Sequence, residues 1–292
     1  MLKRVFLFLI INVLVIFTIS VVLSLFNVQP YLTRQGLNLQ ALLIFCLIWG
    51  MAGAFISLAL SRKMAKWIMR VQLIDKSGEH AKLFHMVERL AKDAGLSHTP
   101  EVGIFPSNTM NAFATGPSKR RSLVAVSTAL LHQMNEQELE AILGHEISHI
   151  SNGDMVTMTL IQGIVNAFVM FLARIAAYAV SSIGRGDRGR TSYLSYYLMT
   201  FVFEILFMIL GSLVVAFFSR KREYRADHEG AMLSRKEYMI AALEKLKTTK
   251  VPDKKHASMN ALMISTPYKR GFLHLFSTHP PLEARIARLK EF

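Results

Sequence analysis

Two histidines four residues apart, with a glutamate directly after the first, are the residues in this sequence best suited to chemistry. The stretch GHEISHISNGD, residues 144–154, contains His145, Glu146 and His149. Positions i and i+4 of a helix share one face, so both imidazoles can bind one metal ion. Glu146 projects about 100° further round the helix, where its carboxylate can hold a water molecule. The pattern predicts a catalytic zinc site with two ligands and a general base.

The residues around this pattern carry the start and stop signals of a helix. Asn135 can cap the N-terminus, and Glu138, three residues later, completes a capping box. Gly153 follows as a C-terminal stop. Because the histidines lie within a well-delimited helix, a metal site is favoured over the alternative of two solvent-facing histidines.

The third ligand has to come from another part of the chain. The extended three-histidine pattern is not met, because Asn152 and Met155 occupy the positions of its glycine and third histidine. A more distant glutamate is therefore expected, and Glu204, inside a hydrophobic run, is the weaker candidate. Glu223 is the better one, because Asp227 lies four residues later on the same helical face and can orient a ligating histidine. The alternative for Glu223 is an ordinary charge in the basic flank of the preceding run.

The composition indicates a membrane protein with a sizeable soluble part. Hydrophobic residues make up 52% of the 292 residues and the mean hydropathy is +0.33, yet 18% are charged. Residues 5–26 and 37–60 are each long and apolar enough to cross roughly 30 Å of hydrocarbon as a helix. We therefore expect two N-terminal transmembrane helices. The length of the first run argues against a cleaved signal peptide.

A second pair of hydrophobic runs follows the histidine helix, at residues 155–180 and 193–218. Each contains one charge, Arg174 in the first and Glu204 in the second. Ionisable residues within membrane helices usually face a partner, so we expect these two to pair across a helical hairpin. His149 precedes both runs and Glu223 follows both, so the ligands lie on the same side whether or not the hairpin crosses the membrane.

The distribution of basic residues indicates how the chain is oriented in the membrane and does not indicate nucleic-acid binding. The formal net charge is +14, and six of the 34 lysine and arginine residues flank the first two hydrophobic runs, at Lys3, Arg4, Arg62, Lys63, Lys66 and Arg70. This is the positive-inside pattern, which places both flanks in the cytoplasm. No basic stripe alternates with aromatic residues, so nucleic acid is not an expected partner.

We predict four regions along the chain. Residues 1–70 form an N-terminal transmembrane hairpin, and 155–218 form the second hydrophobic hairpin. The two parts of a cytoplasmic domain, residues 71–154 and 219–292, are separated by that second hairpin. Hydrophobic periodicity and turn residues predict helices at 79–94, 234–247 and 280–292, a strand at 100–107, and a β-hairpin over 110–128.

Several stretches, taken in order, resemble the HtpX family of bacterial membrane-bound heat-shock zinc metalloproteases, gluzincins related to the CAAX prenyl endopeptidase. They are NAFATG, LVAVSTALL, HEISHISNGDMVTMTLIQG, SRKREYRADHEGA and STHPPLEARI. The resemblance implies a mainly α membrane protein with a gluzincin-like α+β zinc peptidase domain. It also implies one Zn²⁺ per chain bound by His145, His149 and Glu223, with Glu146 as general base and Asp227 supporting a ligand.

The resemblance also implies a substrate class and a cellular location. It implies cleavage of misfolded or damaged membrane proteins from the cytoplasmic side of the bacterial inner membrane, in the stress response, in parallel with an ATP-dependent membrane protease. The strand containing Asn111 would lie beside the metal and receive substrate as an added strand; the alternative is an ordinary hairpin strand. His279 would stabilise the oxyanion of the tetrahedral intermediate, or else cap the last helix.

Two other functions compete with this expectation. One is a membrane-bound chaperone or scaffold with a structural zinc, but the cysteines that usually close such a site are absent, since Cys46 is the only cysteine and lies in an apolar run. The other is a peptidase that processes prenylated C-termini. The presence of Glu146 between the histidines favours catalysis over a structural site.

Overall fold

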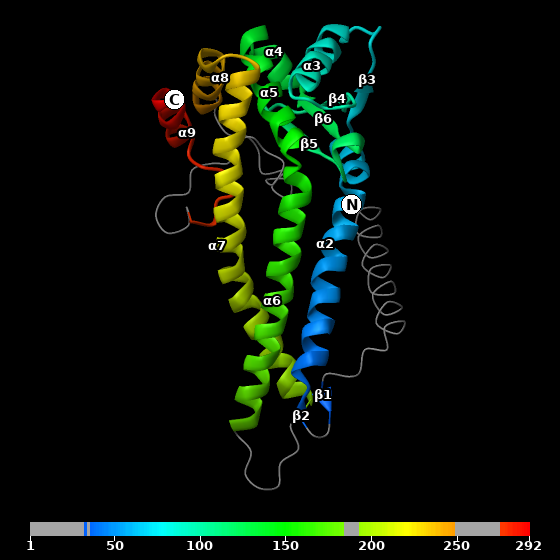
Figure 1. Ribbon diagram of the computed structural model, residues 1–292, viewed down its shortest axis with the longest axis vertical. Helices are drawn as coiled ribbons and strands as arrows, with labels where there is room; N and C mark the ends of the chain where they lie inside the picture. Colours follow the sequence, from blue (N-terminus) through cyan, green and yellow to red (C-terminus); the bar gives the residue numbers. More distant parts are fainter. Residues whose placement is uncertain (1–31, 34–35, 184–192, 249–274) are drawn as a thin grey trace. The chain divides into compact units, whose positions relative to one another are not determined.

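The computed structural model describes residues 32–33, 36–183, 193–248 and 275–292 (Figure 1). The first predicted transmembrane helix, residues 5–26, lies outside them, so the count of two N-terminal spans stays a prediction. The chain divides into two compact units, each built from separate stretches: Met1–Ser57 with Thr159–Val215, and Leu58–Met158 with Ala216–Phe292. The structure is mainly helical, with a small sheet.

Three described helices are long and apolar enough to cross a membrane: α2 (Leu39–Met69), α6 (Asp154–Ile183) and α7 (Tyr193–Leu233). They account for the predicted runs 37–60, 155–180 and 193–218. A short hairpin of β1 (Leu32–Thr33) and β2 (Gly36–Leu37) precedes α2. The helices support the expectation of a membrane protein.

The apolar unit contains the predicted charge pair. The Arg174 guanidinium on α6 donates to a carboxylate oxygen of Glu204 on α7 at 2.7 Å. The same guanidinium lies 5.5 Å from the ring centroid of Phe45 on α2. The pairing of Arg174 with Glu204 is thus confirmed, and the partly buried Arg174 links three apolar helices.

The second unit contains a four-stranded sheet in the order β3-β4-β6-β5. Its strands are β3 (Gln72–Ile74), β4 (Glu101–Phe105), β5 (Ala112–Thr115) and β6 (Leu123–Ser127). β4 and β6 are parallel, whereas the other two pairs are antiparallel. The predicted strand and β-hairpin are confirmed, with a 3-10 turn, η1 (Lys119–Arg121), between β5 and β6. Among the described strands, β5 pairs only with β6 and forms an edge of the sheet.

The helices of this unit share one hydrophobic core with the sheet and include every helix predicted for the soluble part. They are α3 (Ala81–Asp93), α4 (Thr128–Gln133), α5 (Glu136–Asn152), α8 (Lys236–Thr248) and α9 (Leu282–Glu291). The capping box of Asn135 and Glu138 is formed at the start of α5, and Gly153 ends that helix with a φ of 69°. The local signals therefore fix both ends of the histidine helix.

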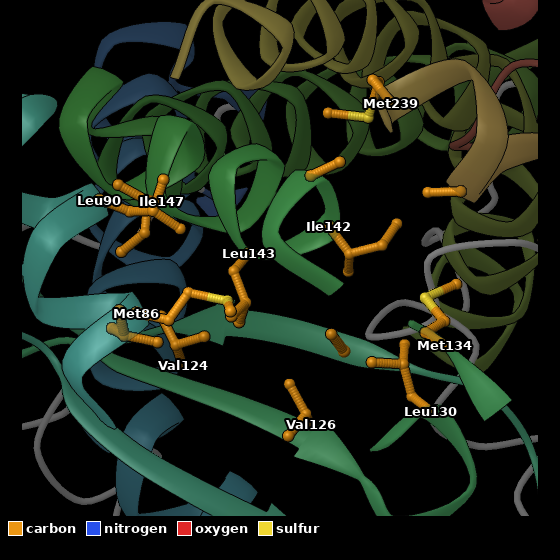
Figure 2. Packing of buried hydrophobic residues seen from close by; sticks show 14 of the residues in the cluster. Met86, Leu90, Val124, Val126, Leu130, Met134, Ile142, Leu143, Ile147 and Met239 are labelled. Carbon is orange, nitrogen blue, oxygen red and sulfur yellow. The ribbon is translucent and has the colours of Figure 1, made fainter. Parts of the chain in front are cut away.

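The core lies between α5 and the sheet (Figure 2). Leu143 and Ile147 of α5 and Val124 and Val126 of β6 are completely buried. Burial of each such side chain contributes about 1.5–3 kcal/mol before the entropic cost of ordering it. Because the same helix carries both histidines, this packing holds them on a rigid platform.

The helix α7 is continuous from the apolar run through the residues that follow it. Its 41 residues carry the chain past position 218 without a break and bring Gly230 against Gly144 of α5. A Cβ built on Gly230 would lie 2.8 Å from the backbone nitrogen of His145, so a larger residue does not fit. The two helices approach this closely only because both positions are glycine.

We predict that Gly230→Ala lowers the free energy of unfolding by about 1–3 kcal/mol, because the added methyl group meets backbone atoms of α5 that cannot move freely. Thermal unfolding of the purified protein in detergent measures this. Gly53→Ala is the matched control, since a Cβ on Gly53 in α2 meets nothing within 4 Å. The control should be neutral or slightly stabilising, and equal effects of the two changes would contradict the close approach.

Candidate metal centre

The structure brings together His145 and His149 from α5 and Glu223 from α7. One ligand atom from each of the three residues lies within 4.8 Å of the others. The Nε2 atoms of the histidines are 3.2 Å apart, and His149 Nε2 lies 3.4 Å from Glu223 Oε1. All three side chains are buried, and Glu223 is completely inaccessible. Glu204, the weaker candidate for third ligand, is paired with Arg174 instead.

The donor atoms fit a divalent metal ion. Glu223 Oε1 is buried and accepts no hydrogen bond from any described residue, and its ion pair with the Arg222 guanidinium is long, at 3.5 Å. A buried carboxylate oxygen that is compensated only in this way is costly. A cation between this oxygen and the two Nε2 atoms would compensate it. Two imidazoles and one carboxylate leave a fourth position open, which is the ligand arrangement of a catalytic zinc site.

Each histidine is oriented by a carboxylate at its other ring nitrogen. His145 Nδ1 lies 3.0 Å from Asp227 Oδ1, and His149 Nδ1 lies 2.7 Å from Asp154 Oδ2. Both carboxylates are nearly inaccessible to solvent. A hydrogen bond from Nδ1 fixes the tautomer in which the Nε2 lone pair is available to a metal. The expected partner Asp227 therefore lies beside His145, and Asp154 makes the equivalent contact with His149.

The third ligand is oriented as well, by a histidine from the C-terminal part of the chain. His279 Nδ1 lies 2.8 Å from Glu223 Oε2, the oxygen that does not face His149. The Ser277 hydroxyl donates to the carbonyl of His279, and Arg220 on α7 donates to the carbonyl of Ser277. These contacts dock the segment before α9 beside the metal ligands.

Arg285 on α9 neutralises the buried Asp227. Its guanidinium donates two hydrogen bonds to the Asp227 carboxylate, at 2.7 and 2.5 Å, and the side chain is 1% exposed. This bidentate geometry is the strongest kind of pairing between the two groups. The sequence prediction did not include Arg285, because it used only the apolar face of the last helix. The available signal was an arginine six residues after the predicted site residue His279.

The electrostatics of the buried cluster favour charged side chains. Burial lowers the pKa of His145, but the hydrogen bonds to Asp227 and Glu223 outweigh it and raise that pKa to about 9. For His149, burial also opposes the charged form, and the contacts with Asp154 and Glu223 raise its pKa. A metal ion must therefore displace protons from the two imidazoles when it binds.

The other predicted site residues lie on elements next to these ligands. Glu146 is buried on α5 beside His145 and does not belong to the ligand group. Asn111 is buried immediately before β5, the edge strand, and its backbone exchanges hydrogen bonds with Ser127. Because β5 packs against α5, the strand reaches the helix that carries both histidine ligands.

A helix with two histidines and a glutamate between them, joined by a glutamate ligand from a later helix, defines a metal-dependent peptidase. The model of Peptidase family M48 matches residues 77–292, so the chain belongs to this family and is a metalloprotease. Protease HtpX of Thioalkalivibrio sulfidiphilus is 48% identical over 293 residues, covering 99% of this chain and 98% of that protein. The Protease HtpX homolog of Bacillus licheniformis is 49% identical over 300 residues, covering 99% of each.

A solved structure shows the same fold. The crystal structure of S. mikatae Ste24p matches 98% of this chain with a TM-score of 0.66 and 18% sequence identity. This chain covers 64% of that chain's length. The apolar helices and the relationship to the HtpX proteases agree in indicating a membrane metalloprotease.

We predict that Arg285→Leu destabilises the protein by about 3–5 kcal/mol and lowers its metal content, because the buried Asp227 loses both guanidinium hydrogen bonds and keeps only its contact with His145. Thermal unfolding and metal analysis of the purified protein measure the two effects. Arg288→Leu makes the same change one turn later at an exposed position of α9, where the guanidinium lies 4.8 Å from the ring centroid of Tyr224, and should cost about 1 kcal/mol or less. Comparable losses in both variants would show that Arg285 has no special role.

We also predict that metal affinity rises with pH. Below a pH of about 9 the metal-free His145 is protonated, so binding releases its proton, and the apparent affinity should rise about tenfold per pH unit over pH 6.5–8.5 from this group alone. The raised pKa of His149 acts in the same direction. Competition between the protein and a chelator of known proton affinity measures the slope, and a pH-independent affinity over this range would contradict the interpretation.

Proposed function

We propose that the protein is a zinc-dependent endopeptidase of the bacterial inner membrane that cleaves misfolded or damaged membrane proteins from the cytoplasmic side. The observation that carries the proposal is the buried group of His145, His149 and Glu223 with Glu146 beside it, in a chain of family M48. Nitrogen and carboxylate ligands in this number suit Zn²⁺, one per chain.

The residues around the open coordination position of the metal determine the chemistry. Zinc held there would supply Lewis acidity and bring the pKa of a bound water toward about 7. Glu146 accepts the proton of the attacking water and passes it to the leaving amine. His279 is already engaged with Glu223 through Nδ1, so only Nε2 remains for stabilising the oxyanion.

The edge strand β5 supports a way to bind varied substrates. An extended polypeptide that adds to β5 is recognised mainly through backbone hydrogen bonds, which suits unfolded proteins of different sequence. Asn111, at the start of that strand, would contact the substrate.

The position of the hydrophobic hairpin supports multi-pass insertion with the site in the cytoplasm. The ligands on either side of the hairpin meet in one compact unit, so its two ends lie on one side of the membrane. Arg62, Lys63, Lys66 and Arg70 lie on α2 or directly after it and belong to this same unit. In this arrangement the enzyme would act on membrane proteins in parallel with an ATP-dependent membrane protease.

We predict that Glu146→Gln lowers cleavage of an unfolded substrate by about 10²–10⁴-fold, because the amide cannot accept the proton of water. The zinc content should stay at that of the wild type. Glu140→Gln is the matched control, since Glu140 lies on the same helix and pairs with the half-exposed Arg89 away from the ligands. Full cleavage by purified, zinc-loaded Glu146→Gln would contradict the mechanism, and a wild-type protein that binds zinc without cleaving would favour a scaffold with structural zinc.

A further inference from the structure

The junction between α5 and α6 turns within three residues. Asn152 is the last residue of α5, Gly153 has a left-handed φ of 69°, and Asp154 is the first residue of α6. This turn brings the Asp154 carboxylate back to His149, a metal ligand five residues earlier. A residue with a side chain would be strained at position 153, so the glycine is needed for the contact.

The two oxygens of Asp154 contact different partners. Oδ2 lies 2.7 Å from His149 Nδ1, and Oδ1 accepts a hydrogen bond of 2.5 Å from the Arg225 guanidinium on α7. The Asp154 side chain is 2% exposed, whereas that of Arg225 is 50% exposed. The buried carboxylate therefore connects a metal ligand before the hydrophobic hairpin with a cation after it.

The helix α7 contacts the site through two pairs of residues, each pair one turn apart. Glu223 and Asp227 contact the histidines, while Arg225 and Glu229 contact the junction. The second junction contact is a hydrogen bond from the side chain of Asn152 to the Glu229 carboxylate. Residues two apart on a helix point about 200° from each other, so the two pairs occupy different faces.

We propose that Asp154 is a positioning residue that fixes the ring of His149 for the metal, and that Arg225 acts by holding Asp154. The inference rests on metal binding by the proposed ligands. A carboxylate at Nδ1 fixes the imidazole tautomer and makes Nε2 more basic, and loss of such a partner typically weakens metal binding 10–100-fold. Asp154 precedes the hydrophobic hairpin in sequence and Arg225 follows it, so their ion pair joins the two ends of the hairpin. Metal binding by His149 and formation of this ion pair therefore stabilise each other.

The experiment measures Zn²⁺ affinity of the full-length protein by chelator competition, together with the visible absorption spectrum of the Co²⁺-substituted protein. Asp154→Asn should weaken Zn²⁺ binding by about 10–100-fold and shift the Co²⁺ bands. Arg225→Gln should weaken binding by less than about fivefold, because Arg225 is half exposed, and Arg225→Lys should restore part of the loss. In the double variant, Arg225→Gln should add no loss to that of Asp154→Asn.

Glu229→Gln is the control, because it weakens the neighbouring junction contact without touching Asp154 or His149. Wild-type affinity and spectrum in Asp154→Asn would overturn the proposal, as would an equal loss in Glu229→Gln or additive losses in the double variant. If Asp154→Asn does not fold, the Zn²⁺ affinities of Arg225→Gln, Arg225→Lys and Glu229→Gln are compared instead. Equal affinities in all three variants would overturn the proposal. A wild-type protein that binds no Zn²⁺ would instead overturn the proposed function.

Discussion

The buried carboxylate of Glu223 is the constraint on which the rest of this structure depends. A charge without access to water is tolerated only when other groups compensate it. Oε2 contacts His279 and lies 3.6 Å from His145 Nε2. Oε1 lies 3.4 Å from His149 Nε2 and 3.5 Å from a guanidinium nitrogen of Arg222, and forms no hydrogen bond with a described residue. The site is therefore built to hold a cation, and each neighbouring element has to approach closely enough to complete it.

That requirement explains features that lie away from the ligands. The helices α5 and α7 cross at Gly144 and Gly230, where side chains would keep the ligands apart. The helix α9 supplies Arg285, which offsets the charge of Asp227. Residues on α5, α7 and α9, which are distant in sequence, thus share one network of charges. A change in any one of them alters the environment of the metal ligands.

The sequence predicted those features that depend on local spacing. The pair of histidines, the capping box and the glycine stop lie within one helix, so periodicity and capping were sufficient to place them. The pair of Arg174 and Glu204 was also predicted from the sequence, because a charge within an apolar run requires a partner. Glu223 was predicted because Asp227 lies four residues later on the same helical face.

The sequence did not indicate contacts that depend on the tertiary fold. Asp154 directly follows the predicted helix stop, and only the left-handed turn at Gly153 returns its carboxylate to His149. Arg285 looked like an exposed charge of an amphipathic helix and is fully buried against Asp227. The continuity of α7 beyond residue 218 was equally hidden, because the change from apolar to charged residues resembled the end of a helix.

The central claim is that two imidazoles and the Glu223 carboxylate hold one metal ion. X-ray absorption at the zinc edge of the purified protein, compared with that of Glu223→Ala, tests it most directly. The account predicts two nitrogen ligands at about 2.0–2.1 Å with further oxygen ligands and no sulfur, and loss of bound zinc in the variant. Zinc retained by Glu223→Ala with an unchanged spectrum would contradict it.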